Sequence, residues 1–156
     1  MWRRGRQTGS SRSWYANGRP RNLFEKTRTW TKRSVYWHAN GVKTRETSCP
    51  DEPGTCRHRT WSTTGRPLSD YTQENGRYES LYRTWHANGR PRLRAHYRRG
   101  QLDGDYVEWH SSGRLLAKGS YRAGRKHGLW QRWSSDGSRF ETIWALGKRH
   151  GTATGW

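Results

Sequence analysis

The chain has 156 residues, of which 29% are hydrophobic, and its 31 Lys and Arg residues outnumber 12 Asp and Glu residues, for a formal net charge of +19. This length suits one domain, but the apolar content is far below the roughly 45–50% of ordinary globular chains, which excludes a thick hydrophobic core. No run approaches the about 18 consecutive apolar residues of a membrane span and no apolar signal-peptide core is visible, so we expect a soluble protein, intracellular or within a particle.

Residues 1–13 are basic, rich in Arg and Ser, and free of acids. Such a start is compatible with an organelle transit peptide. Because Trp14 already belongs to the repeat that follows, cleavage would have to fall before it. We favour a basic N-terminal arm that becomes ordered on a partner.

From residue 14 onward, a tryptophan followed four residues later by glycine recurs at intervals of 23 or 24 residues. The six repeat tryptophans are Trp14, Trp37, Trp61, Trp85, Trp109 and Trp133. A fixed period of this length is the signature of a repeat array and argues against the disorder that low hydrophobicity and high charge otherwise indicate. We therefore predict one array over residues 14–156, with about six repeats of about 24 residues. We expect the repeat tryptophans to lie in the core rather than to be exposed for stacking on unpaired bases.

Asn-Gly pairs at 17–18, 40–41, 75–76 and 88–89 predict β-hairpins with type I′ turns, because both residues tolerate positive φ. Between the turns, the segment 92–97 alternates between apolar residues and basic ones. This pattern predicts strands with a basic outer face. The predicted fold is all-β: an elongated single antiparallel sheet of stacked β-hairpin repeats.

Residues 46–60 interrupt the pattern with a turn-rich loop that contains the chain's two cysteines, Cys49 and Cys56. A disulfide closing this hairpin is plausible in an oxidising compartment, and two free thiols are the alternative in the cytosol. Cys49, Cys56 and His58 do not match a metal-ligand spacing, so we expect no metal site here.

A second motif lies between the repeat tryptophans. An aromatic residue precedes the Trp by three positions at Tyr82, Tyr106 and Trp130, and a Tyr-x-x-Gly motif begins at Tyr97 and Tyr121. Together the motifs resemble the MORN repeat family, in particular the shorter variant found in tandem in bacterial antitoxin-like proteins and in large DNA viruses. The resemblance implies β-hairpins stacked into one elongated sheet and implies no catalytic activity.

We expect no enzyme activity and no cofactor. Most histidines directly follow a repeat Trp or directly precede a repeat Gly, which is unlike a unique active site. The acids form no convergent pair, and no nucleophile, phosphate-loop or zinc-protease motif is present.

Arginine supplies 25 of the 31 basic residues. Its planar guanidinium pairs with phosphate or carboxylate in a bidentate manner, so this bias favours an anionic partner, although a high-GC coding sequence would also enrich Arg. Four residues, which we call the turn arginines, each follow a turn glycine: Arg19, Arg66, Arg90 and Arg114. With Arg92 and Arg94 they are the predicted polyanion-binding residues. The alternative is a charged sheet edge that prevents aggregation.

We therefore expect a scaffold subunit of a larger assembly, such as a nucleoprotein particle or virion, that docks on nucleic acid or acidic protein. A protein–protein interaction module of antitoxin-like type is the alternative. An adaptor for anionic membranes is disfavoured because no amphipathic helix or lipidation signal is present. An edge-to-edge oligomer is compatible with the open sheet.

Overall fold

A computed structural model describes residues 9–27, 29–50 and 54–155, with side chains described up to residue 150. The chain forms two compact units, Met1–Gly76 and Arg77–Trp156. The described residues form strands and turns and contain no helix, and thus no helix that could cross a membrane. The prediction of an all-β fold is confirmed.

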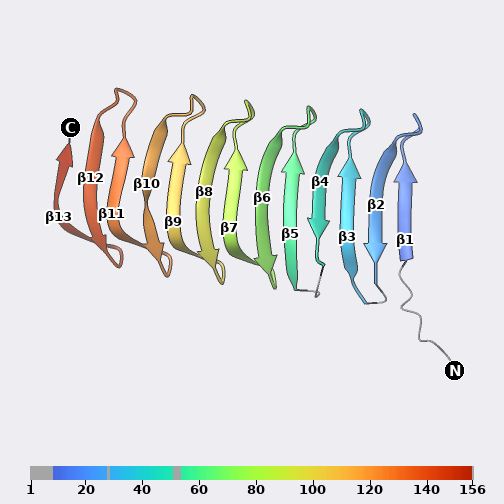
Figure 1. The fold of residues 1–156 in the computed structure, drawn as a ribbon, viewed down its shortest axis with the longest axis horizontal. Helices are drawn as coiled ribbons and strands as arrows, with labels where there is room; N and C mark the ends of the chain where they lie inside the picture. The colour runs from blue at the N-terminus through green and yellow to red at the C-terminus, as the bar shows by residue number, and fades with distance from the viewer. Residues whose placement is uncertain (1–8, 28, 51–53, 156) are drawn as a thin grey trace. The chain divides into compact units, whose positions relative to one another are not determined.

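Each unit is an antiparallel sheet in which the strands follow one another in sequence order (Figure 1). The first unit contains β1 (Gly9–Trp14), β2 (Pro20–Lys26), β3 (Thr31–Trp37), β4 (Lys43–Ser48), β5 (Thr55–Trp61) and β6 (Pro67–Glu74). The second contains β7 (Arg77–Trp85), β8 (Pro91–Arg98), β9 (Gln101–Trp109), β10 (Leu115–Arg122), β11 (Arg125–Trp133), β12 (Arg139–Ala145) and β13 (Lys148–Gly155). The predicted sequence of antiparallel hairpins is confirmed.

The boundaries of the first unit differ from those expected. The predicted arm ends earlier, because its residues from Gly9 onward form β1 and pair with β2, from Gly9 opposite Lys26 to Trp14 opposite Pro20. Backbone pairing does not require apolar side chains, so a Ser-rich segment can join the sheet. Residues 1–8 lie outside the described part of the chain.

The predicted loop at 46–60 is also shorter than expected. Its flanks belong to β4 and β5, which pair from Arg45 opposite Thr60 to Ser48 opposite Arg57. A disulfide joins Cys49 and Cys56 at the end of this hairpin, with the Cα atoms 4.2 Å apart. Residues 51–53 lie outside the described residues.

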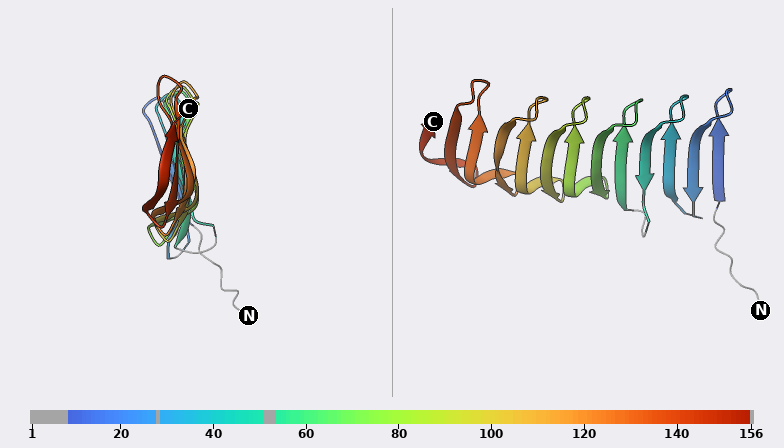
Figure 2. Two further views of the ribbon diagram at one scale, coloured as in Figure 1. Left: turned by 90° about the vertical axis from the view of Figure 1, so that its left-hand side faces the viewer. Right: turned by 45° about the horizontal axis from the view of Figure 1, so that its top comes forward.

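Two kinds of turn lie at opposite ends of the strands (Figure 2). At the end that follows each repeat Trp, only the glycine has positive φ, for example 87° at Gly89, and the Gly89 N–H donates to the carbonyl of His86. This is a type I turn closed by a glycine bulge. The type I′ prediction is therefore wrong at residues 17–18, 40–41 and 88–89.

The Asn side chain supports this turn. The Oδ1 atoms of Asn17, Asn40 and Asn88 each accept the backbone N–H two residues later, at 2.9–3.1 Å. The same turn forms without Asn at Thr64-Gly65 and Ser112-Gly113, so it belongs to the repeat rather than to the Asn-Gly pair.

Turns at the other end do have the type I′ conformation at Asn75-Gly76, where φ is 49° and 76°. The same pair of positive φ values recurs where the first turn residue is Arg99, Ala123 or Leu146.

Each sheet has two faces, which are distinguished by their aromatic residues. In the second unit, Tyr82 and Tyr106 are both cross-strand partners of Ala95, so their side chains project from one side, the Tyr face. The next residue along β7, Arg83, projects from the opposite side, the Trp face, where its guanidinium lies 5.7 Å from the centre of the Trp85 ring.

The expectation that the repeat tryptophans form the core is wrong. Trp14 is 58% exposed, and the other five are half-buried. Neither unit has a second layer over the Trp face in the described residues, so these rings stay in contact with solvent.

The packed side is instead the Tyr face, where the aromatic residues of the second motif contact one another. In the second unit, Tyr106, Tyr121 and Trp130 meet at ring-centre distances of 5.0–5.5 Å, and Tyr78, Tyr82 and Tyr97 form a similar group at 5.1–5.6 Å. Trp130 is only 3% exposed. Small residues beneath the rings, such as Ala95 and Gly119, let the aromatic side chains lie flat on the sheet.

Candidate polyanion-binding surface

Three of the turn arginines connect consecutive repeats within a unit. Arg114 Nη1 donates to the carbonyl of Ser135 at 2.9 Å, Arg19 Nη1 donates to Ala39 at 3.5 Å, and Arg90 Nη1 donates to Ser112. All four turn arginines are exposed. A guanidinium has five N–H donors, so a bond to the next turn leaves donors that can contact an anion. Arg19, Arg90 and Arg114 thus have a structural role that sequence reasoning missed.

The turn asparagines reinforce the same connection. Nδ2 of Asn17, Asn40 and Asn88 donates to the carbonyls of Ala39, Thr63 and Ser111 respectively, at 2.7–2.9 Å. Each Asn therefore uses its oxygen within its own turn and its nitrogen on the next turn, 22 or 23 residues later. The turn ends of each unit are held in register, so the turn arginines have a defined spacing.

Arg92 and Arg94 lie on β8 and are exposed, as predicted for the basic face. Arg94 is the cross-strand partner of Arg83, which lies over Trp85. The Trp face of the second unit therefore carries exposed arginines of β8 beside Arg83 and the Trp85 ring.

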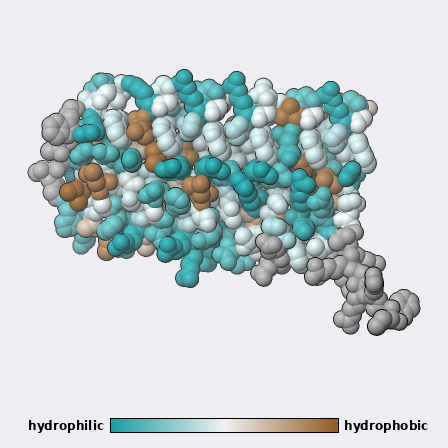
Figure 3. Space-filling model, in the orientation of Figure 1, coloured by the Kyte–Doolittle hydropathy of each residue, from teal (hydrophilic) through white to brown (hydrophobic). Residues whose placement is uncertain are grey.

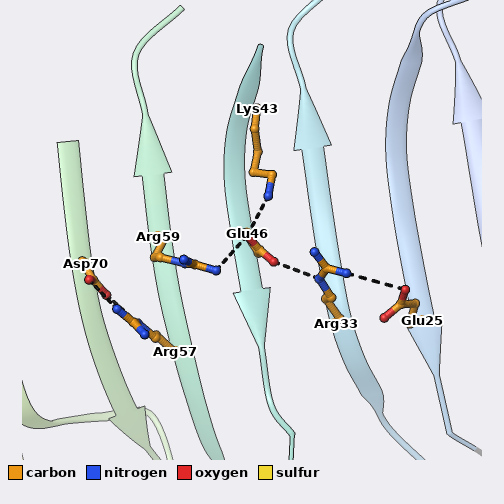
Figure 4. A network of polar contacts seen from close by, with 7 residues as sticks. All are labelled: Glu25, Arg33, Lys43, Glu46, Arg57, Arg59 and Asp70. Carbon is orange, nitrogen blue, oxygen red and sulfur yellow. Dashed lines mark hydrogen bonds and ion pairs between the residues drawn. The ribbon is translucent and has the colours of Figure 1, made fainter. Parts of the chain in front are cut away.

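Three acids of the first unit, Glu25, Glu46 and Asp70, contact cations (Figure 4). Glu46 is 4% exposed and accepts hydrogen bonds from Arg33 Nε at 2.8 Å, Lys43 Nζ at 2.9 Å and Arg59 Nη2 at 3.0 Å. Arg57 and Asp70 form a bidentate pair at 2.8 and 2.7 Å.

Burial alone would raise the pKa of Glu46, but the hydrogen bonds from Lys43 and Arg33 and the nearby Arg59 charge lower it below its ordinary value. Glu46 therefore stays ionised and neutralises part of the charge that surrounds it. Lys43 and Arg59 also lie 5.3 and 5.6 Å from the centre of the Trp61 ring. Sequence reasoning missed this cluster because Arg33 and Arg59 each lie 13 residues from Glu46, on neighbouring strands.

In the second unit, two further acids contact arginines, with Asp103 3.4 Å from Arg98 and Glu141 3.4 Å from Arg139. The Tyr106 hydroxyl donates to Glu108 Oε2 at 3.0 Å. Burial, followed by this bond, raises the pKa of Tyr106, so it stays neutral. These acids thus serve internal contacts, and basic residues outnumber acids 31 to 12 over the whole sequence. On the face drawn in Figure 3, hydrophobic residues form small separate patches among hydrophilic ones.

The histidines contribute to turns and packing. His86 Nε2 lies 2.9 Å from the carbonyl of Trp109, and His110 Nδ1 lies 3.0 Å from Ser112 Oγ. The His58 ring stacks on Tyr71 at 5.0 Å, and burial, with the Arg45 charge, lowers its pKa. Within the described residues, no three His, Cys, Asp or Glu side chains are grouped to hold a metal ion.

A scan of the chain against protein-family models finds no match, and a search of the curated proteins finds none either. The MORN-like nature of the repeats therefore stays a prediction based on residues 14–156.

Proposed function

We propose that this chain is a non-catalytic β-hairpin repeat scaffold that docks on nucleic acid through its arginine-rich surface, as a subunit of a nucleoprotein particle or virion. The observation that carries the proposal is the net charge of +19. Acids such as Glu46, Asp70, Asp103 and Glu141 form ion pairs within their own unit, and the net charge of +19 remains after every acid is counted. A surface of this kind binds phosphates without reading base sequence.

The architecture supports a structural rather than a catalytic role. The exposed turn arginines recur with the repeats, and bonds between consecutive turns fix their positions within each unit. Two strands at about 4.8 Å spacing would separate Arg90 and Arg114, which lie in consecutive repeats of the second unit, by roughly 10 Å. This spacing suits an extended polyanion that is contacted at intervals. We extend the proposal to the repeat type and assign the hairpins to a MORN-like class.

A second candidate is a module that binds one acidic protein. The half-exposed repeat tryptophans favour it, because Trp and Arg are the residues most enriched in protein-interface hot spots. The two functions are distinguished by whether nucleic acid or an acidic polypeptide binds this surface.

The test is an anisotropy titration of the full chain with labelled DNA and RNA of generic sequence, with poly-glutamate as competitor. We expect micromolar or tighter binding at low salt that is insensitive to sequence. Arg92→Gln/Arg94→Gln should weaken it about equally for every sequence. Absence of binding to either nucleic acid at low salt contradicts the proposal and favours the acidic-protein candidate.

A further inference from the structure

The second unit has a shallow depression on its Tyr face that the candidate surface above does not include. Its volume is about 220 Å³, and it is lined by Lys126, Trp130, Arg132, Phe140, Trp144 and Arg149. It is smaller than the roughly 300–1,000 Å³ of ordinary ligand pockets. A planar ring fits such a space better than a large folded ligand does.

Two exposed or half-exposed rings of β12 line this depression, and each has an arginine as cross-strand partner. Phe140, which is 45% exposed, lies opposite Arg132 of β11, and Trp144 lies opposite Arg149 of β13. The two rings are four residues apart on one strand, which is about 13 Å at about 3.3 Å per residue. The β12 strand thus presents two separate pairs of an aromatic ring and a guanidinium.

The Trp130 side chain at the floor of the depression is fixed by a hydrogen bond. Trp130 is buried and its Nε1 donates to the carbonyl of Ser120 at 2.9 Å. Lys126 Nζ lies 4.3 Å from the centre of the Trp130 ring and 5.0 Å from that of Trp144. Burial, followed by the Arg132 charge, lowers the pKa of Lys126, which is the effect of a desolvated and positive environment.

The charge of the depression is not balanced internally. Both Arg132 and Arg149 are exposed, and neither forms an ion pair with a carboxylate in the described part of the chain. Glu108, an acid on the same face, is two strands from Arg132 through Ala117, or roughly 10 Å, and accepts the Tyr106 hydroxyl. The depression therefore combines exposed aromatic surface with three cations.

We propose that this depression is a subsite for single-stranded nucleic acid, in which unpaired bases stack on Phe140 and Trp144 while Arg132 and Arg149 contact the adjoining phosphates. Stacking needs a base whose face is free, so the subsite selects single strands over duplex. The inference rests on the proposed function, because a nucleic acid must first bind the basic surface. The subsite specifies, beyond the proposed function, which kind of nucleic acid binds and where its bases lie.

The test compares the affinities of the full chain for labelled oligo(dT) and for a duplex of equal length, at one salt concentration. Phe140→Leu/Trp144→Leu keeps both side chains apolar but removes both rings, and should lower the affinity for oligo(dT) about tenfold or more while changing duplex binding less than about twofold. Phe140→Tyr/Trp144→Phe keeps two rings and should retain the preference for oligo(dT). This conservative pair separates stacking from a loss of folding.

Matched controls lie in the first unit. Phe24→Leu removes a ring from that unit's aromatic contact with Tyr36, and Arg12→Gln/Arg45→Gln removes two exposed charges, as Arg132→Gln/Arg149→Gln does. The controls should leave the ratio of oligo(dT) to duplex affinity unchanged, whereas Arg132→Gln/Arg149→Gln should lower it. If the wild type binds both probes and Phe140→Leu/Trp144→Leu keeps the wild-type ratio, the subsite is overturned and the proposed function stands. If the wild type binds neither probe at low salt, both are overturned.

Discussion

Glu46 has three cationic neighbours, and its replacement by Gln is the most informative single substitution in the first unit. The substitution would remove the negative charge and leave Arg33, Lys43 and Arg59 facing one another. Because these three side chains are more than a third exposed, water screens part of the repulsion. We expect Glu46→Gln to lower the free energy of unfolding by about 1–3 kcal/mol in urea denaturation. Glu25→Gln is the control, since Glu25 makes one exposed contact with Arg33 at 3.8 Å and should change stability by less than about 0.5 kcal/mol.

Because the pKa of Glu46 is lowered by folding, we also predict that the stability of the protein depends on pH. The pKa of Glu46 is lowered in the folded protein, so its contribution to stability is present above the ordinary value of 4.5 and is lost as the pH falls through the lower folded value. The wild type should therefore lose stability below about pH 4.5 more steeply than Glu46→Gln does, as measured by urea midpoints across that range. If the urea midpoints of the wild type and Glu46→Gln fall in parallel as the pH is lowered, the pKa of Glu46 does not change on unfolding and the prediction is wrong.

Gly119 tests whether the Tyr face is the packed side of the second unit. A Cβ at this position would lie 2.4 Å from the Trp130 ring, which is buried and hydrogen-bonded. Gly119→Ala should cost about 1–3 kcal/mol of unfolding free energy, because the ring has to shift. Gly9→Ala is the matched control, since a Cβ there meets nothing within 4 Å. Equal stability of the two variants would contradict the packing described.

The turns that follow the repeat tryptophans are the elements that connect consecutive hairpins. Asn88→Asp keeps the oxygen that accepts the Arg90 N–H but removes the donor to the Ser111 carbonyl. We expect it to lower stability by about 1 kcal/mol, because a carboxylate then faces a carbonyl oxygen. Asp136→Asn makes the reverse change in a turn that uses only the oxygen, on the Ser138 N–H, and should have little effect on the urea midpoint. An equal loss in both variants would mean that the bond between turns contributes nothing.

The repeat and its hairpins could be predicted from the sequence because a fixed Trp…Gly spacing reflects the length of two strands and two turns. The turn type could not be predicted at residues 88–89, since an Asn-Gly pair also suits a glycine bulge when the Asn side chain accepts its own turn's N–H. The sequence also does not show which aromatic residues form the packed face. The more regular motif, the repeat Trp, lies on the open face, and the weaker motif around Tyr106 and Trp130 packs over small residues.

The candidate site could be predicted only in part. The turn arginines are exposed, as a binding surface requires, but the bonds of Arg19, Arg90 and Arg114 to the next turn depend on the register of residues 20 to 22 positions apart. The ring–arginine pairs of β12 likewise depend on cross-strand register. Single-sequence periodicity places residues within a repeat and does not show which side chains meet between repeats.

At the scale of the whole molecule, charge dominates the proposed function. The chain has 31 basic residues and 12 acidic ones, and acids such as Glu46, Asp70, Asp103 and Glu141 lie against arginines or a lysine of the same unit. A protein with this excess repels copies of itself and attracts polyanions over about one Debye length, about 10 Å at 0.1 M salt. Binding should therefore depend on the number of phosphates contacted more than on any one residue.

The most direct test of this account is the salt dependence of binding to generic duplex DNA. If Arg19, Arg66, Arg90, Arg92, Arg94 and Arg114 each contact a phosphate, the logarithm of the binding constant should fall with the logarithm of salt concentration with a slope of about −5. Arg92→Gln/Arg94→Gln should reduce the magnitude of that slope by about 2. A slope near zero, or one that is unchanged in the variant, would contradict the claim that this arginine-rich surface binds nucleic acid.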